Sequence, residues 1–320
     1  MRFHMLMTFA VLAVVALTLP PAATLRAASD DQFLGRWDIS MPGKDGGRAR
    51  FCWLEVSREG GALKGRFNSG GGAQFPLTEI TIEKGELQFQ YPQGRPPDQT
   101  RVVWKATAKG GKLEGTAELG KEGTRSWSAV PCPAWPKDPP KGKPGKPVAL
   151  FNGKDVGGWL GQVPGKELGW SVKEGILQNA GSNANNIYTE QKFKDFKLDI
   201  EFNVDPKSNS GVYLRGRYEI QIMDQADRPL DVHAIGALYG FVIPPVNAAK
   251  PAGQWQKFEI TLIANRVTVI LNGTKLMENA EAPGITGGAL DANEGEPGPI
   301  MIQGDHGRVQ FRKIELTPLI

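Results

Sequence analysis

The chain has 320 residues, a formal net charge of +4 and 22% charged residues. A chain of this length is expected to hold about two domains, each large enough for its own core. Basic and acidic residues are mixed except in one proline-rich stretch, and no basic face with interleaved aromatic residues appears. This composition argues against a nucleic-acid partner.

The N-terminus has the layout of a secretory signal peptide. Two basic side chains precede an apolar run from Met5 to Leu19, and small residues follow as far as Ala28. Because the run is short for a membrane span, we expect residues 1–28 to be removed on export. The mature protein would then be periplasmic or extracellular, with no stable membrane span. An uncleaved N-terminal anchor is the alternative.

Residues 30–135 consist of short strand-like runs bounded by glycine-rich turns, which is typical of an all-β domain. A pattern of Trp, Gly-Gly, Leu and Gly occurs twice, beginning at Trp53 and at Trp104. A meander of such hairpins closes into a small antiparallel β-barrel, and the opening Gly35-Arg36-Trp37 is similar to that of lipocalin-like barrels. The sequence leaves open whether this domain binds a ligand or is a spacer.

Both cysteines of the chain, Cys52 and Cys132, lie in this first domain. In an exported protein a disulfide between them is expected, and two separate buried thiols are the alternative. Two thiols alone cannot build a structural zinc site, and the mature chain adds only His233 and His306. His233 is expected to be structural or exposed.

The boundary between the domains is a linker at residues 136–147, where five prolines, four lysines and two glycines cannot pack a core. Residues 148–320 have clearer strand signals. Apolar and polar residues alternate strictly from Lys197 to Val204, and Asn272-Gly273 is a strong hairpin signal. At least eight such strands without a long helix predict a jelly-roll β-sandwich.

One strand of this second domain carries a dense group of polar side chains. Arg217, Glu219 and Gln221 share one face, whereas Tyr218 and Ile220 share the other. Sugar hydroxyl groups both donate and accept hydrogen bonds, so carboxylates, amides and arginine suit a concave sugar-binding sheet. An ordinary solvated sheet face is the alternative.

Three further segments supply candidate residues. His306 lies in a glycine-flanked loop before the last strand, where it is either a general acid or base oriented by Asp305 or a surface histidine. Asn209-Ser210-Gly211 is either the rim of the site or a turn. Glu201 is either a site carboxylate or a solvent-exposed one.

Ordered motifs through residues 148–320 resemble the 3-keto-disaccharide hydrolase family. They are Leu150 to Asp155, Trp170 to Gly175, Asn209 to Arg215, Tyr218 to Asp224, Gly236 to Gly240 and Gly298 to Gly307. The resemblance implies a concanavalin A-like sandwich that cleaves glycosides already oxidised to a ketone at carbon 3. It says little about residues 30–135.

The chemistry that the resemblance implies needs a base, an acid and donors for an enolate. The residues that we expect to be catalytic are His306, Glu219 and Asp224. The residues that we expect to bind the sugar are Arg215, Gln221, Glu201, Asn209, Tyr239 and Gln303.

Two other functions stay open. One is ordinary glycoside hydrolysis by two carboxylates, and the other is a lectin-like module that binds glycan without cleaving it. No cofactor is expected. A divalent cation stays open because Glu219, Asp224, Asp305 and His306 could supply ligands, although no segment has the spacing of a known metal loop. The expected partner is a carbohydrate substrate, and the sequence does not give the oligomeric state.

Overall fold

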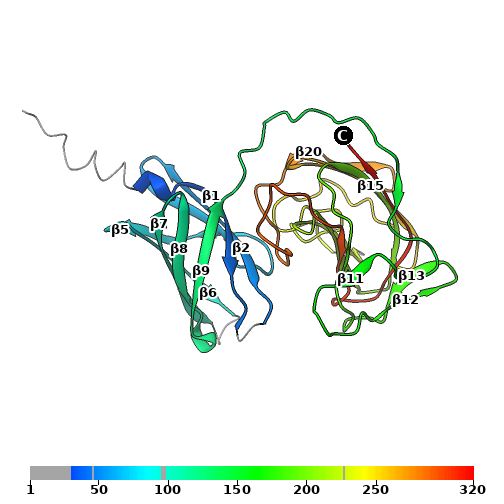
Figure 1. Cartoon of the computed structure of the whole chain (residues 1–320), viewed down its shortest axis with the longest axis horizontal. Coiled ribbons are helices and arrows are strands. Elements are labelled where there is room, and N and C mark those ends of the chain that lie inside the picture. The colour runs from blue at the N-terminus through cyan, green and yellow to red at the C-terminus, as the bar shows by residue number, and fades with distance from the viewer. Residues whose placement is uncertain (1–29, 45–46, 95–98, 226–227) are drawn as a thin grey trace, which may run out of the picture.

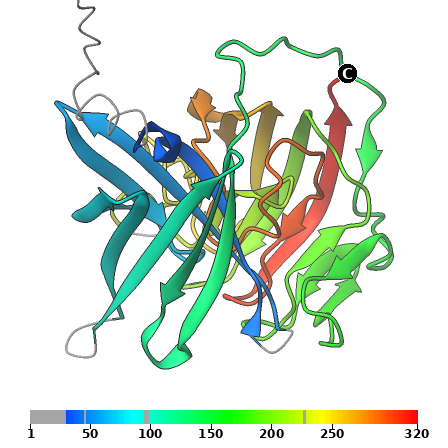
Figure 2. The same ribbon diagram turned by 60° about the vertical axis from the view of Figure 1, so that its left-hand side comes forward.

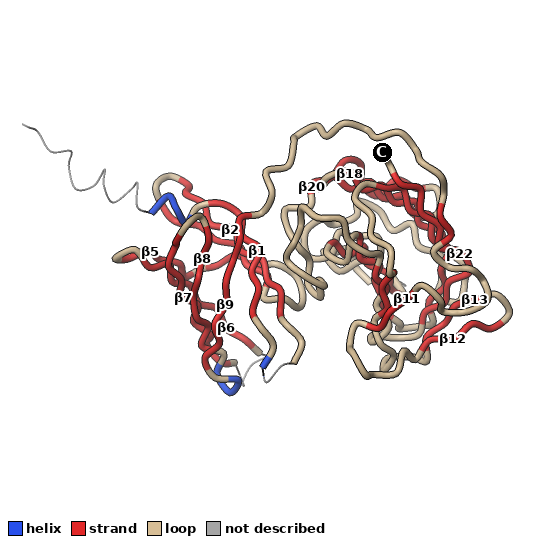
Figure 3. The backbone as a smooth tube through the Cα atoms, in the orientation of Figure 1, coloured by secondary structure: helices blue, strands red, loops and turns tan. Residues whose placement is uncertain are grey.

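The structure is a computed structural model that describes residues 30–44, 47–94, 99–225 and 228–320 (Figure 1). The predicted signal peptide lies outside these residues. No helix in the described part of the chain is long and apolar enough to cross a membrane. The chain forms two domains built from strands (Figure 3). The helical elements named in the described residues are short 3₁₀ turns, which confirms the predicted all-β fold class.

The first domain is a barrel-like antiparallel meander. Its nine strands follow the order β4-β3-β2-β1-β9-β8-β7-β6-β5, so β1 pairs with both β2 and β9. The strands are β1 (Gly35–Met41), β2 (Arg50–Glu59), β3 (Ala62–Asn68), β4 (Phe75–Leu77), β5 (Glu79–Glu83), β6 (Glu86–Gln93), β7 (Thr100–Lys109), β8 (Lys112–Glu118) and β9 (Thr124–Pro131). The 3₁₀ turns are η1 (Asp31–Phe33) and η3 (Gly120–Glu122).

The repeated Gly-Gly pairs form the hairpin turns that the sequence predicts. Gly60-Gly61 joins β2 to β3 and Gly110-Gly111 joins β7 to β8, and all four glycines have positive φ, which suits two-residue hairpin turns. Trp37 lies in the barrel core, where its ring N–H donates to the Phe33 carbonyl at 2.9 Å. That hydrogen bond ties η1 to the end of the barrel.

The second domain is a sandwich of two antiparallel sheets, as predicted. The larger sheet has the order β12-β13-β22-β15-β18-β19-β20, with β10 paired to β22, and the smaller has the order β11-β14-β21-β16-β17. The larger sheet contains β10 (Val148–Ala149), β12 (Trp170–Lys173), β13 (Ile176–Asn179), β15 (Phe196–Val204), β18 (Gln256–Ile263), β19 (Arg266–Leu271), β20 (Thr274–Glu281) and β22 (Val309–Pro318). The smaller contains β11 (Trp159–Gly161), β14 (Ile187–Thr189), β16 (Asn209–Leu214), β17 (Tyr218–Met223) and β21 (Met301–Ile302).

Strand alternation places the sandwich core between the two sheets. Leu198, Ile200 and Phe202 of β15 are fully buried and pack with Tyr218 and Ile220 of β17 in one apolar cluster. The polar face of β17 therefore points away from this core. At the β19–β20 hairpin, Asn272 and Gly273 both have positive φ, which suits the predicted turn.

The linker leaves the barrel and runs over the top of the molecule to the sandwich (Figure 1). It contributes little to the core, as its composition predicts, but its backbone is paired with the C-terminal end of the chain. Lys143 and Ile320 exchange backbone hydrogen bonds of 2.8 and 2.9 Å, and Pro144 forms an isolated bridge with Leu319. This pairing fixes the linker against the sandwich.

The two domains are packed side by side, as Figures 1 and 2 both show. Trp53 points out of the barrel, because Cys52 and Leu54 on either side of it face the barrel core, yet it is fully buried. It packs with Ile285 and meets the Phe241 ring edge-to-face at 5.3 Å. The surface that would otherwise expose this tryptophan is covered by the sandwich.

The predicted disulfide is wrong, since both cysteines are free. Cys52 faces the barrel core, whereas Cys132 packs outside the barrel in the cluster around Trp53. The two thiols therefore lie on opposite sides of the barrel wall. Burial raises the pKa of the Cys52 thiol to about 12, so it is inert.

The close packing of Trp53 predicts a cost for any side chain at Gly284. A Cβ there would lie 1.9 Å from the indole nitrogen of Trp53. Gly284→Ala should therefore destabilise the protein by about 1–3 kcal/mol, the usual cost of overpacking. Thermal unfolding followed by calorimetry measures this loss. Gly71→Ala is the matched control because a Cβ at Gly71 meets nothing within 4 Å, and an equal loss in the two variants would contradict the interface.

Candidate active site

A pocket of about 190 Å³ lies between the domains, over the polar face of β17. The sandwich supplies most of its wall, and the barrel supplies one side. The sandwich residues are Asn186, Asn209, Tyr213, Glu219, Gln221, Tyr239, Gly287, Gly288, Gln303, Asp305 and His306. The barrel residues are Arg48, Gly70, Gly71 and Gly72.

Glu219 is the buried carboxyl group of the pocket. Burial raises its pKa to about 8, the Tyr213 hydroxyl lowers this pKa by hydrogen bonding, and the nearby charge of Asp305 raises it. Tyr213 lies directly opposite Glu219 on β16, and the Gly287 carbonyl at 3.1 Å is a second acceptor within reach of its single hydroxyl proton. Near neutral pH this carboxyl group can either give or take a proton.

Gly211 makes room for that carboxyl group. A Cβ at Gly211 would lie 2.1 Å from the nearer carboxylate oxygen of Glu219. Asn209, Gly211 and Tyr213 alternate along β16 on the pocket side, so the motif Asn209-Ser210-Gly211 begins a strand and is not the turn that the sequence left open. The glycine is needed here because a larger residue would displace the buried carboxyl group.

Three amide side chains in the pocket have unused hydrogen-bonding capacity. The side-chain oxygens of Asn209, Gln221 and Gln303 are buried, and none has a partner in the described part of the chain. Gln221 is only 2% exposed. Buried amides without partners are costly, and hydroxyl groups of a bound sugar would satisfy them.

The loops around β17 are fixed by backbone hydrogen bonds. Tyr239 donates its backbone N–H to the Glu219 carbonyl at 3.0 Å, which covers the free edge of β17. Gln303 donates to the Gly211 carbonyl at 2.9 Å, and Gly304 donates to the Asn186 side chain at 2.7 Å. These contacts place the loop that carries His306 at the rim of the pocket.

His306 and Asp305 form a hydrogen-bonded pair at this rim. The His306 Nδ1 lies 2.6 Å from the Asp305 carboxylate, and this contact raises the pKa of His306 although partial burial lowers it. Burial acts to raise the pKa of Asp305, but the hydrogen bond and charge of His306 outweigh it and the pKa falls. The pair therefore favours a carboxylate beside an imidazolium.

The barrel wall of the pocket is fixed to the sandwich by short contacts. Gly288 donates its N–H to the Gly70 carbonyl at 3.1 Å, and Arg48 donates to the Gly288 carbonyl at 3.3 Å. At Gly287 a Cβ would lie 2.8 Å from the Gly72 carbonyl oxygen, so the two glycine-rich loops meet backbone to backbone. Arg48 adds the one arginine among the lining residues.

The structure brings six of the nine predicted site residues together and separates three. Glu201 lies on the outer side of the larger sheet, where it pairs with Arg312 at 2.5 Å. Arg215 is fully buried beneath the Trp135 ring and donates to the Ala264 carbonyl at 2.6 Å. Asp224 accepts the Lys207 backbone N–H at 2.8 Å and does not line the pocket.

Sequence reasoning missed Arg48, the 70–72 loop, Asn186 and Tyr213. For Tyr213 a signal was available, since strand alternation from Asn209 places it on the same face. The barrel residues have no such signal, because their place depends on how two domains dock. His233 is partly exposed and does not line the pocket, although its ring meets that of the lining residue Tyr239 at 5.1 Å.

The fold and the site together define a β-sandwich domain with a polar pocket lined by carboxyl, amide and imidazole groups. Residues 146–317 match the 3-keto-alpha-glucoside-1,2-lyase-like domain family, and the chain belongs to this family. A 3-keto-disaccharide hydrolase of Bacteroides thetaiotaomicron is 25% identical over an alignment of 169 residues, which covers 41% of this chain and 57% of that protein. The match thus spans little more than half of the curated relative.

Solved structures are similar to part of this chain. One, from Parabacteroides distasonis and assigned as a glycosyl hydrolase, is 27% identical with a TM-score of 0.47, and the alignment covers 58% of this chain and 94% of that chain. Another, a Bacillus subtilis protein with a galectin-like fold, is 14% identical with a TM-score of 0.35 and covers 57% and 99% of the two chains.

The raised pKa of Glu219 predicts how stability depends on pH. In the folded state the Glu219 carboxyl group keeps its proton up to about pH 8, whereas in the unfolded chain it loses this proton near pH 4.5. The free energy of unfolding should therefore fall as pH rises between these values. Tyr213 and Asp305, which also affect the pKa of this carboxyl group, are left unchanged in the variant. Denaturant unfolding at several pH values should give a flatter profile for Glu219→Gln. If the two proteins gave parallel profiles of stability against pH, Glu219 would not carry a buried proton in the folded state.

Proposed function

We propose that this protein is an exported enzyme that cleaves 3-keto-glycosides in the pocket between its domains. Family membership and the printed name of the B. thetaiotaomicron relative support this reaction class. The observation that carries the proposal is the pairing, in one pocket, of a buried carboxyl group of raised pKa with a histidine–aspartate pair and unpartnered amides. Export rests on the sequence of residues 1–28.

The reaction begins with removal of a proton from carbon 2 of the sugar. The ketone at carbon 3 acidifies this proton, because the electrons of the broken C–H bond move into an enolate. Glu219 in its ionised form is the base that we assign to this step, since a carboxylate with a pKa of about 8 is a stronger base than an ordinary one. We assign the side-chain NH₂ group of Gln221, which lines the same pocket, as the donor to the enolate oxygen.

The enolate then expels the glycosidic oxygen from carbon 1. A double bond forms between carbons 1 and 2, the ketone is restored, and the leaving oxygen takes a proton. We assign this proton to the His306 imidazolium, which Asp305 stabilises. Water adding at carbon 1, with return of a proton to carbon 2, completes a net hydrolysis.

The barrel domain supplies one wall of the pocket, and this wall limits which substrates can enter. Arg48 and the 70–72 loop close the side of the pocket opposite the sandwich residues. An arginine there can bind hydroxyl groups or the ketone oxygen of a sugar, and the bare glycine backbone allows the sugar to approach closely. We propose that this wall limits the pocket to a small sugar and not a long polysaccharide.

An activity assay tests the proposed function. The purified chain is offered both anomers of a nitrophenyl glucoside and of its 3-keto counterpart. Nitrophenol should be released from a keto compound only, and Glu219→Gln and His306→Ala should each lower kcat/KM about 100- to 10,000-fold, the usual contribution of a general base or acid.

Glu201→Gln is the matched carboxylate control, because Glu201 lies outside the pocket and its replacement should leave the rate unchanged. Release from the unoxidised glucosides would contradict the elimination route and favour two-carboxylate hydrolysis. Binding of the keto compounds without release would leave a lectin-like module.

A further inference from the structure

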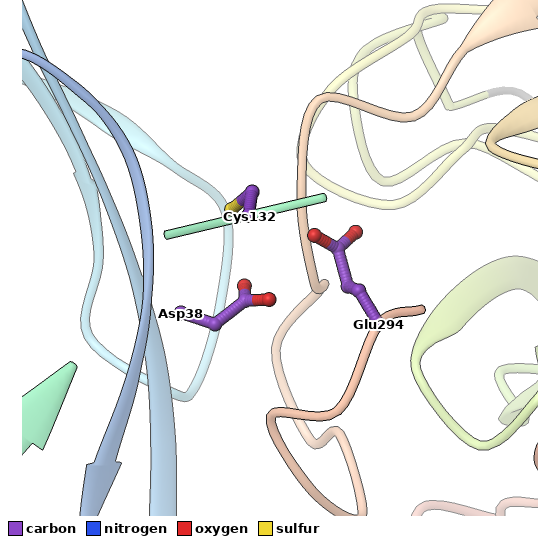
Figure 4. A group of neighbouring side chains, drawn as sticks. All are labelled: Asp38, Cys132 and Glu294. Carbon is purple, nitrogen blue, oxygen red and sulfur yellow. The ribbon is translucent and has the colours of Figure 1, made fainter. Parts of the chain in front are cut away.

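A second cluster of chemically active side chains lies at the domain interface, away from the pocket. It contains Asp38 of β1, Cys132 just after β9, and Glu294 from the segment between β20 and β21. One ligand atom from each lies within 4.8 Å of the other two. Figure 4 shows the three side chains pointing toward one another, with the first two from the barrel and the third from the sandwich.

The two carboxyl groups of this cluster lack the partners that buried charges need. Asp38 is 1% exposed, and neither of its carboxylate oxygens has a hydrogen-bond partner outside the cluster in the described residues. Glu294 is 2% exposed; one oxygen accepts the Tyr218 hydroxyl at 2.5 Å, and the other has no partner in that same part of the chain.

One arginine of the sandwich, Arg217, is already paired with other groups. Arg217 pairs with Asp291 at 2.7 Å and also donates to the Glu296 carbonyl at 2.7 Å. Two adjacent buried carboxyl groups without a paired cation are costly unless a proton or a metal ion neutralises them.

We propose that Asp38, Cys132 and Glu294 bind Zn²⁺ or a divalent transition-metal ion with similar ligand preferences. A thiolate with two carboxylates matches the sulfur and oxygen ligands of Zn²⁺, whereas Ca²⁺ and Mg²⁺ prefer oxygen ligands alone. Ligand atoms around a tetrahedral zinc ion lie about 3.5 Å apart, so the cluster needs only a small contraction to bind it. The Tyr218 hydroxyl orients the Glu294 carboxylate, as an outer hydrogen bond does at many metal sites.

The position of the site implies a structural role. Because the ligands come from both domains, a bound ion would hold the barrel against the sandwich and so fix the barrel wall of the pocket. Binding would also release the thiol proton, so metal affinity should fall at low pH. This inference does not depend on the proposed reaction, since none of the three side chains lines the pocket.

The test uses the full exported chain without an affinity tag. After treatment with a chelator, the protein is titrated with Co²⁺ and, separately, with Zn²⁺. Co²⁺ should give a thiolate charge-transfer band in the near ultraviolet, and Zn²⁺ should displace it at one ion per chain. Zn²⁺ should also raise the thermal midpoint of the protein.

Three variants assign the band to this cluster. Cys132→Ser should abolish it, and Glu294→Gln should weaken metal binding at least tenfold. Cys52→Ser is the matched thiol control, because Cys52 is buried in the barrel core, and it should keep the band. Circular dichroism checks that each variant is folded.

The cobalt spectrum of the unmodified chain decides the proposal even if a variant does not fold. Absence of a thiolate band at saturating Co²⁺, together with no response of the thermal midpoint to Zn²⁺, would overturn it. The carboxyl groups would then be neutralised by a shared proton. A band lost in Cys52→Ser and kept in Cys132→Ser would overturn it as well.

Discussion

The contact between the barrel and the sandwich is the constraint on which the candidate site depends. Trp53 leaves the barrel wall and is buried against Ile285 and Phe241 of the sandwich. The same contact aligns the 70–72 loop with Gly288, which closes the pocket over Glu219. It also removes the Asp38 and Glu294 carboxyl groups of the second cluster from water. One apolar anchor therefore sets both the shape of the pocket and the electrostatics of the interface.

Within the sandwich, strand alternation converts one sequence pattern into two environments. Tyr218 and Ile220 enter the core, so Glu219 and Gln221 must emerge on the other side of β17. A carboxyl group there would normally be solvated. The pocket walls bury it instead, and this burial raises its pKa to about 8. The raised pKa of the proposed base therefore depends on the residues that bury it more than on its position in β17.

Much of this could be predicted from sequence because it depends on local rules. Alternation predicted which residues of β15 and β17 face the sandwich core, and turn chemistry predicted the hairpins at Gly60-Gly61 and Asn272-Gly273. Ordered motifs predicted the family of the second domain. What failed depends on contacts between distant segments. Arg215 follows β16 with a positive φ and is buried under Trp135, a residue that follows the last strand of the barrel. The positions of Arg48 and Cys132 depend on how the two domains dock.

Hydrogen exchange on a substrate-bound enzyme tests most directly whether both domains form one site. Glu219→Gln, expected to bind without turnover, would be saturated with a 3-keto-glycoside and compared with the free protein. The two-domain pocket predicts slower exchange in the 70–72 loop of the barrel together with the 303–306 segment of the sandwich. Slower exchange confined to the sandwich would contradict it, and the barrel would then be a spacer with no part in binding.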